Sequence, residues 1–238
     1  MRRLLAILTC VALCGACGSG SASSSGAVSG ALSLPATAGG AVETQPVPPR
    51  PGKVPFPAHS GADVIRLATL RPPGKVAYDV RVGNGKTYTL ELASDDHHAL
   101  VHQKQDSGEI WIGLDVVRGT VDFSCTAPPA GAPTCKRGDR DGSAAKTASA
   151  ITRILGNSFI HATFDPVAAA SSGVGVGPDT QIGLDVSCLA ASAPVDVRLC
   201  ATRQGYITEL SAASSSVLAT AVTPTLRAAD LDPPAPPQ

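Results

Sequence analysis

Apolar and polar residues alternate along most of the segment from residue 76 to residue 223, a pattern typical of half-buried β-strands. Val76, Tyr78, Val80 and Val82 form one such series, and an Asn-Gly hairpin signal follows at 84–85. Further strands are predicted at 87–92, 98–104, 110–116, 120–125, 181–189, 195–203, 206–212 and 217–223. The pattern therefore predicts an antiparallel meander of about eight or nine strands.

Apolar residues at the spacing of an α-helix occur only in shorter stretches. Residues 63–70 are predicted to form a short helix before the first strand, and residues 144–155 a longer one that stops at Gly156-Asn157. Asp165 is predicted to cap a short turn that begins at Pro166. The fold class is then α+β: a curved antiparallel sheet with a helical insertion, after the fifth predicted strand, packed on its concave face.

The amino terminus has the three parts of an export signal. Arg2 and Arg3 precede an apolar run at 4–13, and small residues follow it. Cys14-Gly15-Ala16-Cys17 resembles a bacterial lipobox, which implies a signal peptide at 1–16 and acylation of Cys17. The alternative is an ordinary secreted protein in which Cys17 carries no lipid.

Composition shifts divide the rest of the chain. Residues 17–60 are rich in Ser, Gly, Ala and Pro and are predicted to be a flexible tether after the lipidated cysteine. Residues 61–230 are predicted to be one domain, and 231–238 a Pro-rich tail. Acyl chains on Cys17 would anchor the protein in the cell membrane, on its extracytoplasmic side.

Four cysteines remain after the predicted signal and anchor, which in an oxidising compartment indicates two disulfides with three possible connectivities. We favour the local pairs Cys125–Cys135 and Cys188–Cys200. Cys188 shares its parity with apolar neighbours whereas Cys200 does not, so this pair requires a bulge or another pairing. A zinc site is the alternative, although neither pair has the short spacing of zinc ribbons.

The charge of the chain and its candidate functional residues argue against several classes of function. The formal net charge is +0 and charged residues make up 16%, which argues against a nucleic-acid partner. Asp96, His98 and His102 are the densest group of potential metal ligands, with an exposed polar turn as the alternative, and neither a metal nor a cofactor is predicted. Residues 173–177 are predicted to be a flexible glycine-rich loop rather than a phosphate loop. No GxSxG nucleophile motif is present, and we expect no enzyme activity.

The order of these features resembles actinobacterial lipoproteins of the LolA-like superfamily, of the LppX and LprG type. The features are the lipobox at Cys17, the tether, a hairpin with Cys125 and Cys135, the helical stretch with Phe164-Asp165-Pro166, and the closing Leu231-Asp232-Pro233-Pro234. The resemblance implies a half-barrel sheet closed by helices around an apolar cavity that takes acyl chains.

The expected function is therefore non-catalytic binding or carriage of an amphiphilic molecule, such as a lipid or glycolipid. The aromatic content of 3% limits the size of the wall that such a site can have. The expected lining residues are Tyr78, Leu90, Ile112, Ile151, Ile154 and Leu155. The alternative is an envelope surface-interaction or sensing module with a solid core and no ligand.

Overall fold

The computed structural model describes residues 54–138, 142–170, 173–192 and 196–238, with the side chains of 150–154 outside this description. The predicted signal peptide, Cys17 and most of the predicted tether lie outside the described residues. Lipidation of Cys17 therefore stays a prediction.

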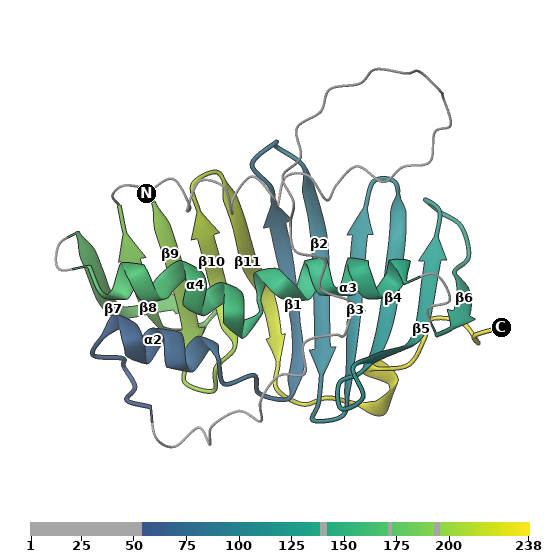
Figure 1. The fold of residues 1–238 in the computed structure, drawn as a ribbon, viewed down its shortest axis with the longest axis horizontal. Helices are drawn as coiled ribbons and strands as arrows, with labels where there is room; N and C mark the ends of the chain where they lie inside the picture. Colours follow the sequence, from purple (N-terminus) through teal and green to yellow (C-terminus); the bar gives the residue numbers. More distant parts are fainter. Residues whose placement is uncertain (1–53, 139–141, 171–172, 193–195) are drawn as a thin grey trace, which may run out of the picture. The chain divides into compact units, whose positions relative to one another are not determined.

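The described residues are built on one open antiparallel sheet of 11 strands (Figure 1). The strand order is β6-β5-β4-β3-β2-β1-β11-β10-β9-β8-β7. Strands β1 to β6 step outward in one direction and β7 to β11 step back from the other edge. The first and last strands consequently pair in the middle of the sheet.

The strands on the β1 side are β1 (Gly74–Arg81), β2 (Thr87–Ser94), β3 (His98–Gln105), β4 (Gly108–Asp115), β5 (Thr120–Ala127) and β6 (Thr134–Arg137). The strands on the other side are β7 (Val174–Gln181), β8 (Leu184–Ala191), β9 (Val197–Thr202), β10 (Ile207–Ala212) and β11 (Ser215–Thr223). The antiparallel meander is thus present, but the predicted number of strands was too low.

The two strands that the sequence pattern missed are the edges of the sheet, β6 and β7. The prediction of a flexible loop at 173–177 was wrong, because β7 begins at Val174 and pairs with β8 along its length. Pro178 lies within β7; proline lacks a backbone N–H and is tolerated in a strand that has a neighbour on one side only.

Three α-helices, α2 (Gly61–Ala68), α3 (Ser143–Ile154) and α4 (Asn157–Ala168), lie on one face of the sheet (Figure 1). A short 3-10 turn, η2 (Ala228–Asp230), follows β11. The helix predicted at 144–155 corresponds to α3, and the one predicted at 63–70 to α2. The short turn predicted at Pro166 was wrong: Gly156 is the N-cap of α4, which continues through Pro166. The α3–α4 insertion follows β6, which the pattern had not counted.

Strand register identifies the residues on the helix-covered face. A methyl group at Gly61 of α2 would lie 3.1 Å from Leu189 Cδ1, so Leu189 faces the helices. Successive pairing continues this row of side chains through Leu199, Leu210, Val217 and Val80. All five are buried. This face forms the core of the domain.

The C-terminal tail docks on the sheet. The backbone N–H of Gln238 donates to the carbonyl of Cys135 at 3.1 Å, and the N–H of Arg137 donates to the carbonyl of Gln238 at 3.3 Å. Ala235 packs against a cluster of Phe123, Cys125 and Cys135. The Pro-rich end of the chain is therefore part of the folded unit.

Candidate functional site

Three of the predicted lining residues, Tyr78, Leu90 and Ile112, lie on the helix-covered face. Tyr78 pairs directly with Leu90. Ile112 pairs with Val101, and Val101 pairs with Leu92, which shares the parity of Leu90. A row of apolar side chains therefore crosses the centre of the sheet beneath the helices.

The predicted lining residues that can be described are closely packed. Tyr78, Leu90, Ile112 and Leu155 retain 4%, 3%, 0% and 2% of their exposure. A cavity large enough to hold a water molecule beside these side chains would increase their exposed fractions. The low exposed fractions therefore mean that protein atoms surround the four side chains. Ile151 and Ile154 belong to α3, and their side chains lie outside the described residues.

One cationic side chain reaches the interior at the end of α2. Arg71 has a φ of 52°, in the left-handed region that costs a non-glycine residue about 1–2 kcal/mol. Its Nε donates to Oδ1 of Asn157, the first residue of α4, at 3.1 Å. The residue as a whole is half-buried, but its Nη2 atom is fully buried and has no hydrogen-bond partner in the described structure.

Tyr78 is an ionisable group that interacts electrostatically with Arg71. Its hydroxyl donates to the carbonyl of Ile207 at 3.2 Å. Burial raises the pKa of Tyr78 well above its ordinary value, so the phenol is neutral at physiological pH. Tyr78 consequently supplies no negative charge to Arg71. Sequence analysis missed Arg71, since Arg71-Pro72-Pro73 reads as a polar connection between a helix and a strand.

The helix-free face carries both disulfides, Cys125–Cys135 and Cys188–Cys200, which are the local pairs favoured from the sequence. Cys188 pairs directly with Cys200 across β8 and β9. The sequence pattern placed Cys188 on the same strand face as its apolar neighbours and Cys200 on the face opposite to its own. This difference arises because β8 is buried on both of its faces. Val186 shares the face of Cys188, while Leu199 lies on the opposite, helix-covered face, so no bulge between β8 and β9 is needed.

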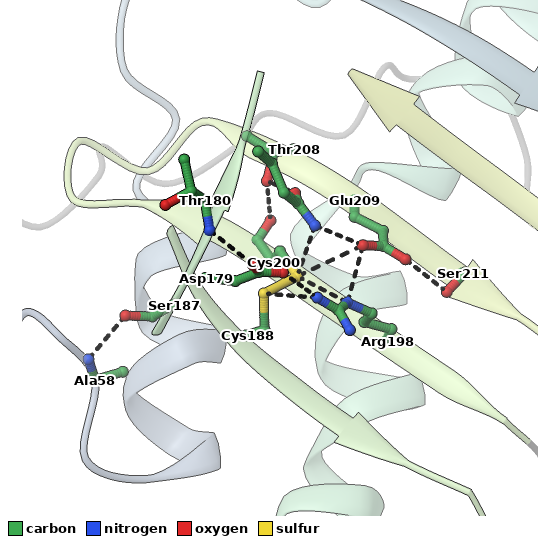
Figure 2. The surroundings of a disulfide bond; sticks show 11 residues. Ala58, Asp179, Thr180, Ser187, Cys188, Arg198, Cys200, Thr208, Glu209 and Ser211 are labelled. Carbon is green, nitrogen blue, oxygen red and sulfur yellow. Dashed lines mark hydrogen bonds and ion pairs between the residues drawn. A yellow bond between two sulfur atoms is a disulfide. The ribbon is translucent and has the colours of Figure 1, made fainter. Parts of the chain in front are cut away.

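A polar cluster covers the second disulfide (Figure 2). Arg198 Nε lies 3.3 Å from Cys200 Sγ and 2.9 Å from Glu209 Oε2, and Arg198 Nη2 pairs with Asp179. Gln181 Nε2 donates to Glu209 Oε2 at 2.6 Å, and Thr208 donates to Gln181 Oε1. The charged and amide groups are paired with one another, so the cluster shields the disulfide rather than offering a binding site.

An aromatic stack lies beside the first disulfide. His102 and Trp111 pair across β3 and β4, with ring centroids 4.5 Å apart and ring planes at 11°. Trp111 packs on the cluster of Phe123, Cys125 and Cys135. The parity of Trp111 had placed it away from Ile110 and Ile112, and the structure agrees.

The residues considered as metal ligands are not brought together. His102 Nε2 lies 2.8 Å from Glu109 Oε2, whereas His98 Nδ1 is 3.8 Å from Asp95. Asp96 lies in the turn before β3. Within the described ranges, no three His, Cys, Asp or Glu side chains are arranged to hold a metal ion.

A hollow of about 460 Å³ lies at one end of β8 and β9. Its walls include Gly175, Ala190, Arg198, Ser211 and Ala213. None of the six predicted lining residues contributes to it. It gives no support to a site between sheet and helices.

No helix in the described part of the chain is long and apolar enough to cross a membrane. Comparisons with protein-family models and with curated proteins find no match for this chain.

Proposed function

We propose that this chain is a non-catalytic exported lipoprotein of the LolA-like type. It is anchored to the extracytoplasmic side of the cell membrane by acylated Cys17, and it binds or carries an amphiphilic ligand between its sheet and its helices. The arrangement of the helices carries this proposal: α2, α3 and α4 all lie on one face of the sheet (Figure 1). The apolar side chains of Leu92, Val101 and Ile112 neighbour one another on that face. Acyl chains buried there gain about 0.8 kcal/mol per CH₂.

The packing of the helices indicates how a ligand would enter. Among the described residues, α2 packs most closely on β8 and β9, and α3 packs most closely on β5. Helix α4 packs on α2 and on α3. Because Tyr78, Leu90 and Ile112 are enclosed by protein atoms, an acyl chain enters by displacing the α3–α4 pair from the centre of the sheet.

One observation favours the alternative, a surface-interaction or sensing module with a solid core. The low exposure of the four described lining residues leaves no water-sized space beside them. In that case α3 and α4 stay on the sheet, and the helix-free face with Trp111 and His102 is the surface that a protein partner would contact. The two functions differ in whether the interior accepts added volume.

Native mass spectrometry of the full-length chain, extracted from bacterial membranes in an uncharged detergent, tests the proposal. Wild-type protein is expected to retain an amphiphile beyond its own acyl chains. Ala148→Trp adds bulk at a fully buried position of α3 and is expected to lose this ligand while remaining folded. Ala145→Trp, at a half-buried position of the same helix, is the matched control and should retain it. Ligand-free wild-type protein, together with severe destabilisation of Ala148→Trp, would establish the solid core instead.

A further inference from the structure

Arg71 is a buried cation without an anionic partner. Its Nη2 is buried and forms no hydrogen bond, and no ion pair joins it to a carboxylate in the described parts of the chain. Burial lowers the pKa of Arg71 to about 10, which still leaves the guanidinium protonated at pH 7. A charge removed from water in this way is costly unless an opposite charge approaches it.

The amino-terminal end of α4 adds to the positive potential at the same place. Asn157 is the first residue of this 12-residue helix, and it accepts the hydrogen bond from Arg71 Nε. No side chain caps the helix at Gly156, and its first turn contains no acidic residue. The first-turn amides of a helix carry about half a positive charge, so the guanidinium, held on the Asn157 side chain, lies near a second positive group.

We propose that Arg71 and the first turn of α4 form a binding site for an oxyanion, either a carboxylate or a phosphate. The planar guanidinium offers Nη2 as a donor, and the helix end supplies a favourable dipole, which together match a tetrahedral or planar oxyanion. The source of the anion rests on the proposed function: it is the head group of an anionic amphiphile whose chains enter the apolar interior.

The surroundings of the site fit an amphiphile. Leu70 and Leu155 precede Arg71 and the α4 N-terminus in the chain, and both are buried at 2% exposure. Tyr78, on the helix-covered face, keeps its hydroxyl bonded to Ile207. An anionic head group held by Arg71 would therefore contact the guanidinium on one side, and its acyl chains would lie against the buried apolar residues on the other.

Thermal unfolding of the full-length chain in inorganic phosphate tests the site. Wild-type protein is expected to show a rise in melting temperature with phosphate over a chloride control of equal ionic strength. Asn157→Asp places a carboxylate beside Arg71 and should abolish that rise while itself raising the melting temperature. Ala145→Asp, in the first turn of α3, is the matched control that gains a helix-dipole interaction and should keep the phosphate effect. An unchanged phosphate effect in Asn157→Asp would overturn the site.

Titration with two probes that share their chains separates the two possible sources of the anion. Dioctanoyl phosphatidate is expected to bind wild-type protein at least about tenfold more tightly than dioctanoylglycerol, and Arg71→Gln should remove this difference while Arg66→Gln keeps it. Binding of phosphate and phosphatidate with equal affinity, and none of dioctanoylglycerol, would support the anion site and contradict carriage of an amphiphile. Equal binding of both lipids by wild-type protein and Arg71→Gln would support carriage and overturn the anion site.

Discussion

Arg71 and Asn157 lie 86 positions apart in the chain, and a 3.1 Å hydrogen bond from Nε to Oδ1 joins them. The bond connects the end of α2 to the start of α4 and fixes the guanidinium inside the domain. Its Nη2 is left without a partner in the described structure. A buried cation at a helix amino terminus is the feature on which the proposed ligand chemistry depends.

Arg71→Met should stabilise the ligand-free chain. The substitution removes a buried charge whose pKa is lowered to about 10 by desolvation, at the cost of one hydrogen bond to Asn157. We expect the free energy of unfolding to rise by about 1–3 kcal/mol in phosphate-free buffer, measured by urea denaturation. Arg66→Met, at a side chain that is 65% exposed on α2, should change it by less than about 0.5 kcal/mol. Destabilisation by Arg71→Met would show that the guanidinium is already satisfied.

Tyr78→Phe should destabilise the domain, because it removes the hydroxyl that donates to the buried carbonyl of Ile207. The expected loss in the free energy of unfolding is about 1–2 kcal/mol. Tyr88→Phe alters a half-buried tyrosine of the neighbouring strand and is expected to cost less than about 0.5 kcal/mol. Equal effects of the two substitutions in chemical denaturation would argue against a specific role for the Tyr78 hydroxyl.

Deletion of residues 232–238 should make the Cys125–Cys135 disulfide easier to reduce. Ala235 packs against this disulfide, and Gln238 forms two backbone hydrogen bonds with β6. The Cys188–Cys200 disulfide lies under the polar cluster around Arg198 and serves as an internal control. Quenched reduction followed by mass spectrometry of the alkylated cysteines should show faster loss of the first disulfide alone. Equal acceleration of both would indicate general destabilisation instead.

Glu109 should contribute to stability in a pH-dependent manner. The hydrogen bond from His102 holds the pKa of the Glu109 carboxyl below its usual range, and Lys104 adds to this effect. A carboxyl whose pKa is lowered in the folded state stabilises the protein above its unfolded-state pKa, and this contribution is lost as the pH falls through the folded-state value. Between about pH 5 and pH 3, wild-type protein should lose more unfolding free energy than Glu109→Gln.

His102→Ala provides an independent check on that prediction, because it removes the histidine that hydrogen-bonds to Glu109 while leaving the carboxyl in place. Its unfolding free energy should depend on acid pH less steeply than that of the wild type but more steeply than that of Glu109→Gln, because Lys104 still pairs with Glu109. A slope as steep as that of the wild type in either variant would place the acid sensitivity elsewhere in the chain.

Local signals predicted the parts of the fold that local chemistry determines. The alternation from Val76 and the Asn-Gly turn located the first hairpin, and the short spacings of the cysteines identified both disulfide pairs. The edge strands escaped notice because β6 has four residues and β7 is rich in Gly and contains Pro, so their strand structure depends on pairing with β5 and β8.

The sequence-based prediction was wrong or incomplete where tertiary contacts determine the structure. Gly156-Asn157 indicated the end of one helix but also begins the next, since Gly156 in an extended conformation serves as the N-cap of α4. The apolar parity of Tyr78, Leu90 and Ile112 placed these residues on the helix-covered face, whereas their close packing depends on the helices above them. Nothing near Arg71 in the sequence indicates burial, because its partner is 86 positions away.

Release of a bound ligand from the full-length wild-type chain by tandem native mass spectrometry tests the central claim most directly. We predict that the isolated complex releases an amphiphile with acyl chains and an acidic head group, and that Arg71→Gln reduces its occupancy while Arg66→Gln does not. A wild-type chain whose mass is that of the protein and its own acyl chains alone would contradict carriage of an amphiphile between the sheet and the helices.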